Sequence, residues 1–175
     1  MHIHWKTAVL VFVVLIVAGV PARAQEAPAV EVTPYLALGS AGSSPVGTAV
    51  TFPITSTLSL ETDVAYRRGE GDINALSTST SLLWFLPRVG PTMPYVAAGV
   101  GLSQYGTPLF SFDGGDPIGT QSRLATTVNA GGGLKTPVND KLALRTDVRW
   151  FKSFGKQSSE EFRVSQGISF GAGKR

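Results

Sequence analysis

The chain has 175 residues and a formal net charge of +3, and this length is enough for one domain with a buried core. It contains no cysteine, which excludes a disulfide framework and a thiolate metal site. Lys6 and Arg23 lie in the first 24 residues, so the rest of the chain carries 13 basic and 12 acidic residues, a balance that gives no support to a nucleic-acid partner.

Residues 1–24 have the pattern of a cleavable secretory signal. Lys6 provides a basic start, an apolar run continues to Ala18, and residues 22–24 read Ala-Arg-Ala, a small-x-small cleavage pattern. The apolar run is well short of the ~20 residues that a spanning helix needs, which argues against the alternative of a transmembrane anchor. We therefore expect a signal peptide over 1–24 and one exported domain over 25–175.

Eight segments after the leader alternate between apolar and polar residues. Successive side chains of a strand point to opposite faces, so a period of two predicts strands rather than helices. The clearest segment is Leu142 to Phe151, where leucine, threonine, valine and tryptophan occupy even positions and arginine and aspartate occupy odd ones. In chain order the predicted strands are Val30 to Gly39, Val46 to Ile54, Leu58 to Arg67, Ala75 to Leu86, Met93 to Ser103, Arg123 to Lys135, Leu142 to Phe151 and Phe162 to Gly171.

In all eight segments the apolar side falls on even-numbered residues, and no charged residue occupies an even position. Besides Arg123 at a strand end, the odd positions hold a predicted lumen charge network: Glu31, Glu61, Asp63, Arg67, Lys135, Arg145, Asp147, Arg149 and Arg163. A charge that faces hydrocarbon costs a few kcal/mol, whereas opposite charges clustered inside neutralise one another. The asymmetry predicts hydrocarbon outside and charge inside.

The predicted connections also alternate in length. Those after the second, fourth and sixth segments are short, whereas Arg68 to Asn74, Gln104 to Ser122 and Lys152 to Glu161 are longer and polar. The connection from Ser40 to Pro45 is short as well. Short turns on one side and long loops on the other are typical of a membrane barrel with its long loops outside the cell.

Strands of about ten residues can cross a bilayer when they are tilted, and an even number of them can close into a barrel with no unpaired edge in lipid. Outward aromatic residues near the strand ends are expected at the membrane interfaces. They are Tyr66, Trp84, Trp150 and Phe170.

The chain also contains a tandem repeat. Pro34 to Gly39 (Pro-Tyr-Leu-Ala-Leu-Gly) is similar to Pro94 to Gly99 (Pro-Tyr-Val-Ala-Ala-Gly), and Leu58 to Arg67 is similar to Leu142 to Phe151. The repeat predicts two halves of four strands each.

Three motifs together resemble one family. They are Pro94-Tyr95-x-Ala97-x-Gly99-x-Gly101, the run Gly131 to Gly133, and Leu142-x-Leu144-Arg145-x-Asp147-x-Arg149-Trp150-Phe151. They are similar to the small outer-membrane β-barrels of Gram-negative bacteria, the OmpA-like and opacity-protein-like barrels. The resemblance implies an all-β fold, an eight-stranded antiparallel up-and-down barrel in the outer membrane. It also implies contact with lipid and lipopolysaccharide and insertion by the barrel-assembly machinery.

Such a barrel, with its lumen plugged by side chains, is expected to have a structural or adhesion-like surface role through its outer loops, as a monomer without cofactor or metal. The sequences of those loops contain no recognition motif that identifies a surface ligand. A small-solute pore is one alternative, but eight strands enclose an interior that side chains fill. A soluble lipocalin-type barrel would need its apolar side chains inside, contrary to the charge asymmetry.

A lipid-modifying enzyme is a further alternative. The resemblance implies that such barrels mostly use a histidine base, and the only histidines here, His2 and His4, lie in the leader. Asp63 and Asp147 would be the available carboxylate pair, but each alternates with basic residues, which favours a structural ion pair. In the longest loop, Asp113 to Asp116 is a candidate cation contact that is better explained as a solvated turn. We therefore expect no catalytic residues.

Overall fold

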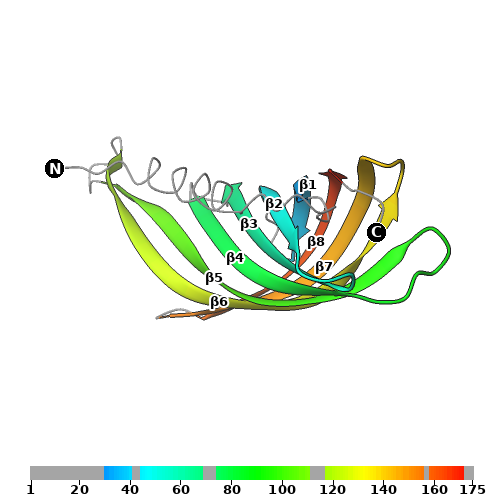
Figure 1. Ribbon diagram of the computed structural model, residues 1–175. Helices are drawn as coiled ribbons and strands as arrows, with labels where there is room; N and C mark the ends of the chain where they lie inside the picture. Colours follow the sequence, from blue (N-terminus) through cyan, green and yellow to red (C-terminus); the bar gives the residue numbers. More distant parts are fainter. Residues whose placement is uncertain (1–29, 41–43, 69–73, 111–116, 156–157, 172–175) are drawn as a thin grey trace.

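The computed structural model describes residues 30–40, 44–68, 74–110, 117–155 and 158–171, and the side chains of 107–121 are not described. The predicted signal peptide and the segment Asp113 to Asp116 lie outside the described residues. The strands are β1 (Glu31–Gly39), β2 (Val46–Pro53), β3 (Leu58–Arg68), β4 (Asn74–Phe85), β5 (Met93–Phe110), β6 (Pro117–Pro137), β7 (Leu142–Phe154) and β8 (Ser159–Phe170). Each pairs antiparallel with the next, and β8 pairs with β1, so the sheet closes into a barrel (Figure 1). The predicted fold class is confirmed.

The predicted alternation of faces is also confirmed. Among the strand side chains that the structure describes, every buried one is odd-numbered, and the large apolar ones that are exposed are even-numbered. Leu36, Leu38 and Trp84, for example, are 60 to 69% exposed. An apolar belt therefore surrounds a lumen that contains the charged residues. Within the described part of the chain, no helix is long and apolar enough to cross a membrane.

The strands are strongly tilted. A row of paired residues that starts at Val32 on β1 passes through Val50, Thr62, Thr80, Val100, Val128 and Lys152 to Glu160 on β8. Val32 itself pairs with Phe170, ten residues beyond Glu160. Closure of a barrel requires such a stagger, and it brings side chains from distant parts of the chain to one level of the lumen.

The segment from Gln104 to Ser122, predicted as a loop, is mostly strand. β5 and β6 remain paired from Met93–Lys135 to Phe110–Pro117, although β4 pairs with β5 only as far as Gly106 and β7 pairs with β6 only from Thr126. Figure 1 shows the two strands continuing past their neighbours at one end of the barrel. The loop prediction was wrong because it was based on glycine, proline and aspartate, which are common in turns. A two-stranded ladder in water needs no apolar face towards lipid, so these residues can also form one.

The predicted loop from Lys152 to Glu161 is also shorter than expected. Lys152 pairs with Glu160 and Ser153 with Ser159, so both strands extend into this polar segment. The polar residues mark the part of the hairpin that leaves the membrane, not the end of the ladder. The other strand boundaries differ from the prediction by one or two residues.

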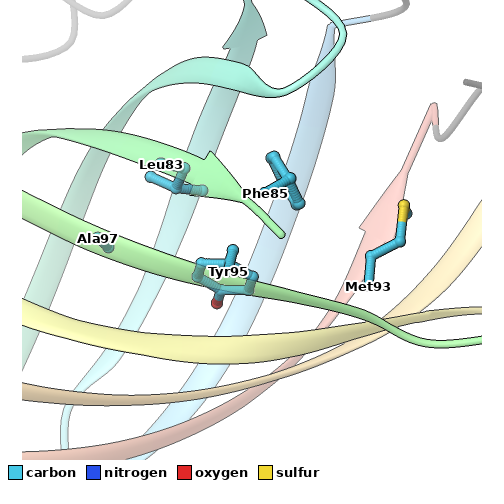
Figure 2. Close-up of a cluster of buried hydrophobic side chains, with 5 residues drawn as sticks. All are labelled: Leu83, Phe85, Met93, Tyr95 and Ala97. Carbon is cyan, nitrogen blue, oxygen red and sulfur yellow. The ribbon is translucent and has the colours of Figure 1, made fainter. Parts of the chain in front are cut away.

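Apolar side chains fill one side of the lumen near the turn between β4 and β5. Figure 2 shows Leu83 and Phe85 of β4 beside Tyr95 and Ala97 of β5, with Met93 nearby. The rings of Phe85 and Tyr95 lie 5.4 Å apart. This cluster lies near the short-turn end, and the Tyr95 hydroxyl is directed towards the charged part of the lumen.

Candidate functional site

The centre of the lumen contains four buried charges, Glu61, Arg145, Asp147 and Arg149, which we call the central cluster. β7 supplies three of them, because the alternation Arg-x-Asp-x-Arg places all three on its inner face. Glu61 reaches them from β3, on the opposite wall. Its Oε1 accepts hydrogen bonds from Arg149 Nη2 at 2.7 Å and Arg145 Nη2 at 3.1 Å, and its Oε2 is bonded to Arg145 Nη1.

Asp147 connects the two arginines within β7. Its Oδ1 accepts from Arg149 Nε at 2.8 Å, and its Oδ2 accepts from Arg149 Nη2 at 3.0 Å and Arg145 Nη2 at 3.2 Å. Two carboxylates therefore neutralise two guanidinium groups, in the multidentate geometry that makes arginine pairs specific. The arrangement cross-links opposite walls of the barrel.

Tyr95 joins the central cluster to the apolar side of the lumen. Its hydroxyl donates to Asp147 and accepts from Arg145 Nε at 2.7 Å, and the Arg145 guanidinium lies 4.9 Å from the ring centroid. Sequence reasoning missed this residue. Two features of the sequence indicate its role in the lumen: its odd-numbered position, which faces the lumen, and its occurrence in the repeated Pro-Tyr motif.

Tyr35, the repeat counterpart of Tyr95, makes the equivalent contact in the first half. It donates to Asp63 at 2.9 Å, and Ser79 also donates to this carboxylate. We expected Asp63 to pair with an arginine, but no cation among the described residues lies within ion-pair distance of it. Glu61 and Asp147 already engage Arg145 and Arg149, so hydroxyl groups satisfy Asp63 instead.

A glycine beneath each tyrosine makes room for its ring. A Cβ on Gly47 would lie 2.6 Å from the Tyr35 hydroxyl oxygen, and a Cβ on Gly133 would lie 2.3 Å from that of Tyr95. Gly47 and Gly133 are the ladder partners of these tyrosines. The tandem repeat thus recurs in three dimensions as a tyrosine that crosses a glycine to reach an aspartate.

The remaining predicted network residues form two smaller groups. At the short-turn end, Lys135 donates to Glu31. At the opposite end, Arg67 Nη1 donates to Glu161 at 3.0 Å, and Arg163 Nη2 lies 3.7 Å from the same carboxylate. Glu161 was missed because it was assigned to a loop, although its odd number places it on the inner side.

Little open space remains in the lumen. Two cavities of about 30 Å³ each lie in it, and Asp63, Phe151 and Arg163 line both. Each is large enough for a water molecule or two. Among the described residues, the buried atoms without a hydrogen-bond partner are Asn129 Nδ2 and Arg163 Nε, and such water would satisfy polar atoms of this kind. The described residues also contain no cluster of His, Cys, Asp or Glu side chains suited to a metal ion.

The predicted interfacial aromatics all face outward. Tyr66 and Trp84 lie near the ends of β3 and β4, and Phe170 ends β8. Trp150 pairs with Phe162 and lies four residues before the end of β7, since that strand continues further than predicted.

No family model matches the sequence, and no curated protein matches it. Solved structures do. Neisserial surface protein A aligns with a TM-score of 0.63 at 14% identity, covering 82% of this chain and 94% of that one. The N-terminal β-barrel domain of Pseudomonas aeruginosa OprF aligns with a TM-score of 0.59 at 18% identity, covering 83% and 98%. The outer membrane enzyme PagL aligns with a TM-score of 0.51 at 18% identity, covering 80% and 98%.

The chain folds as a small outer-membrane β-barrel. The fold and the apolar belt place this barrel in the bacterial outer membrane, in contact with lipid and lipopolysaccharide. The similar structures include an enzyme and a surface protein, so the fold by itself does not select a role.

Proposed function

We propose that the barrel has a structural or surface-interaction role, exerted through its outer connections, and that it transports no solute. The central cluster carries this proposal. Glu61 binds Arg145 and Arg149 across the lumen, and all three side chains are buried. Opening a path would separate buried ion pairs, which costs several kcal/mol for each partner left uncompensated.

The β5–β6 hairpin is the element best suited to contact a partner. Beyond Gly106 on β5 and before Thr126 on β6, the two strands pair only with each other. Their outer edges therefore present unpaired backbone groups outside the barrel, and such edges bind extended segments of other proteins. A surface location for such a hairpin agrees with the name of Neisserial surface protein A, which has the same fold.

We further propose that the barrel is not an enzyme and that the assembly machinery inserts it, guided by the alternating segment that ends at Phe170. Asp63 and Asp147 are the two carboxylates that were candidates for a catalytic pair. Asp63 is bound by two hydroxyl groups, and Asp147 by two arginines and a tyrosine. These donors occupy carboxylate oxygens that a general base would need free to accept a proton from a substrate.

The plugged lumen makes a direct electrical prediction. The purified barrel, inserted in a planar lipid bilayer, should show no steady conductance, because each cavity is too small for a hydrated ion to pass and buried side chains fill the rest of the lumen. Single-channel recording tests this, with a 16-stranded porin as the conducting control. Large, regular current steps from the barrel would contradict the plugged lumen.

The surface role predicts that the hairpin, not the barrel wall, carries adhesion. Replacing residues 107–121 by a short Gly-Ser turn should abolish adhesion of displaying bacteria to cultured epithelial cells and leave the barrel folded. A matched variant with the β4–β5 turn, residues 87–91, replaced in the same way should adhere normally, because that turn lies at the other end. Equal adhesion by all three proteins would refute a role for the hairpin.

A further inference from the structure

Gln166 places an amide in the middle of the lipid-facing surface. It is exposed on the even-numbered side of β8, four residues from Phe162 and four from Phe170. Its ladder neighbours are Leu36 on β1 and Thr146 on β7. An amide surrounded by hydrocarbon is unfavourable unless its donor and acceptor are both bonded.

No group among the described residues hydrogen-bonds to the Gln166 side chain. The opposite wall provides a comparison, because Thr62 and Thr146 occupy equivalent positions in the tandem repeat. Thr62 pairs with Thr80 in the ladder, and their outward hydroxyl groups hydrogen-bond to each other at 3.3 Å. Thr146 pairs with Gln166, and the amide is left without a partner. One half of the barrel thus satisfies its outward polar pair, whereas the other half does not.

The surface around Gln166 is also recessed. A groove of about 640 Å³ crosses the outer face of β7, β8 and β1. Its apolar sides include Leu36, Leu38, Leu144, Val164 and Ile168, and Gln166 is part of its lining. Apolar side chains of an approaching surface can therefore enter beside the amide and bring a hydrogen-bonding group to it.

We propose that two copies of this chain associate in the membrane through this wall, with their Gln166 amides hydrogen-bonded to each other across a two-fold axis. A carboxamide is its own complement, because it carries both a donor and an acceptor. A two-fold axis along the membrane normal keeps every residue at its own depth, so the two Gln166 side chains meet when the axis passes beside β8. Amide pairs of this kind join transmembrane segments.

A lipid chain does not meet the same requirement. At the mid-depth of the membrane a lipid chain is hydrocarbon, which neither donates nor accepts a hydrogen bond. The proposal departs from the monomer expected from the sequence. Closure of the barrel satisfies the backbone hydrogen bonds of a single chain, but it provides no hydrogen-bond partner for an outward side-chain amide.

The absence of native cysteine makes a clean cross-linking test possible. Thr146→Cys places a thiol next to Gln166, and Thr62→Cys places one at the equivalent position of the opposite wall. In lipid vesicles, an apolar bismaleimide that spans about 10 Å, twice the spacing of neighbouring strands, should link Thr146→Cys into a dimer and should not link Thr62→Cys. Adding Gln166→Leu to Thr146→Cys should lower the linked fraction about fivefold or more, the effect of losing an interhelical-type hydrogen bond in lipid.

Folding is checked by the heat-dependent shift of the barrel on electrophoresis. Equal cross-linking from both cysteines, or cross-linking that Gln166→Leu leaves unchanged, would overturn the proposal. Absence of dimer from Thr146→Cys would overturn it too and would leave the groove to lipid. Should Gln166→Leu fail to fold, the comparison of Thr146→Cys with Thr62→Cys decides by itself.

Discussion

Replacing Glu61 by glutamine should lower the free energy of unfolding by about 3–5 kcal/mol, the effect of removing one partner from a buried ion pair. Glutamine keeps the shape of the side chain but leaves Arg145 and Arg149 with a deficit of negative charge. Both arginines bind Glu61 in a region closed to solvent. Urea unfolding of the barrel in lipid vesicles, followed by tryptophan fluorescence, measures the change.

Glu160→Gln is the matched control for this prediction. Glu160 also forms an ion pair, with Lys152 at 2.8 Å, but both side chains lie exposed near the outer end of the β7–β8 hairpin. Water screens and replaces such a pair, so the control should unfold like the wild type. A loss of stability as large in Glu160→Gln as in Glu61→Gln would show that burial of the central cluster contributes nothing.

Leu144→Arg should lower the free energy of unfolding by about 2–4 kcal/mol, because it directs a charge into the hydrocarbon between the interfacial Phe170 and the middle of the wall. Leu144 faces outward on β7, two ladder pairs from the Thr146–Gln166 pair, and it is 44% exposed. The same urea experiment in vesicles gives the value. Leu144→Met, which keeps the side chain apolar, should have little effect.

Depth provides a second comparison for the lipid face. Leu124 also faces outward, but it lies beyond the last β6–β7 pair, Thr126 with Phe154, at the outer end of the wall. An arginine there can reach water, so Leu124→Arg should cost about 0–1 kcal/mol. If Leu144→Arg and Leu124→Arg destabilise the barrel equally, the cost of a charge does not depend on its depth, which would contradict a bilayer around the outer surface.

Much of the fold could be predicted because its signal is local. The period of two in each strand and the restriction of charge to odd positions can be read without knowing what any strand pairs with. The positions of Arg145, Asp147 and Arg149 on one face were therefore available from the sequence, as were the tandem repeat and the closed eight-stranded barrel.

The ends of the strands were less predictable. Residues 104–110 and 117–122 form a ladder although they are rich in turn-forming residues, and Glu161 was placed in a loop although it binds Arg67 in the lumen. Outside the membrane a strand needs only a hydrogen-bonding neighbour, and the apolar alternation that marks it inside the bilayer disappears.

The sequence by itself determined which side of each strand meets lipid and which meets the lumen, because successive side chains of an extended chain must point in opposite directions. Only the tertiary structure decided which lumen charges meet. Glu61 binds arginines 84 and 88 residues later in the chain, and that meeting depends on the tilt and stagger accumulated over the whole barrel. The same stagger left Asp63 to hydroxyl groups and Gln166 without a partner, since the depth and neighbours of a side chain depend on register around the closed sheet.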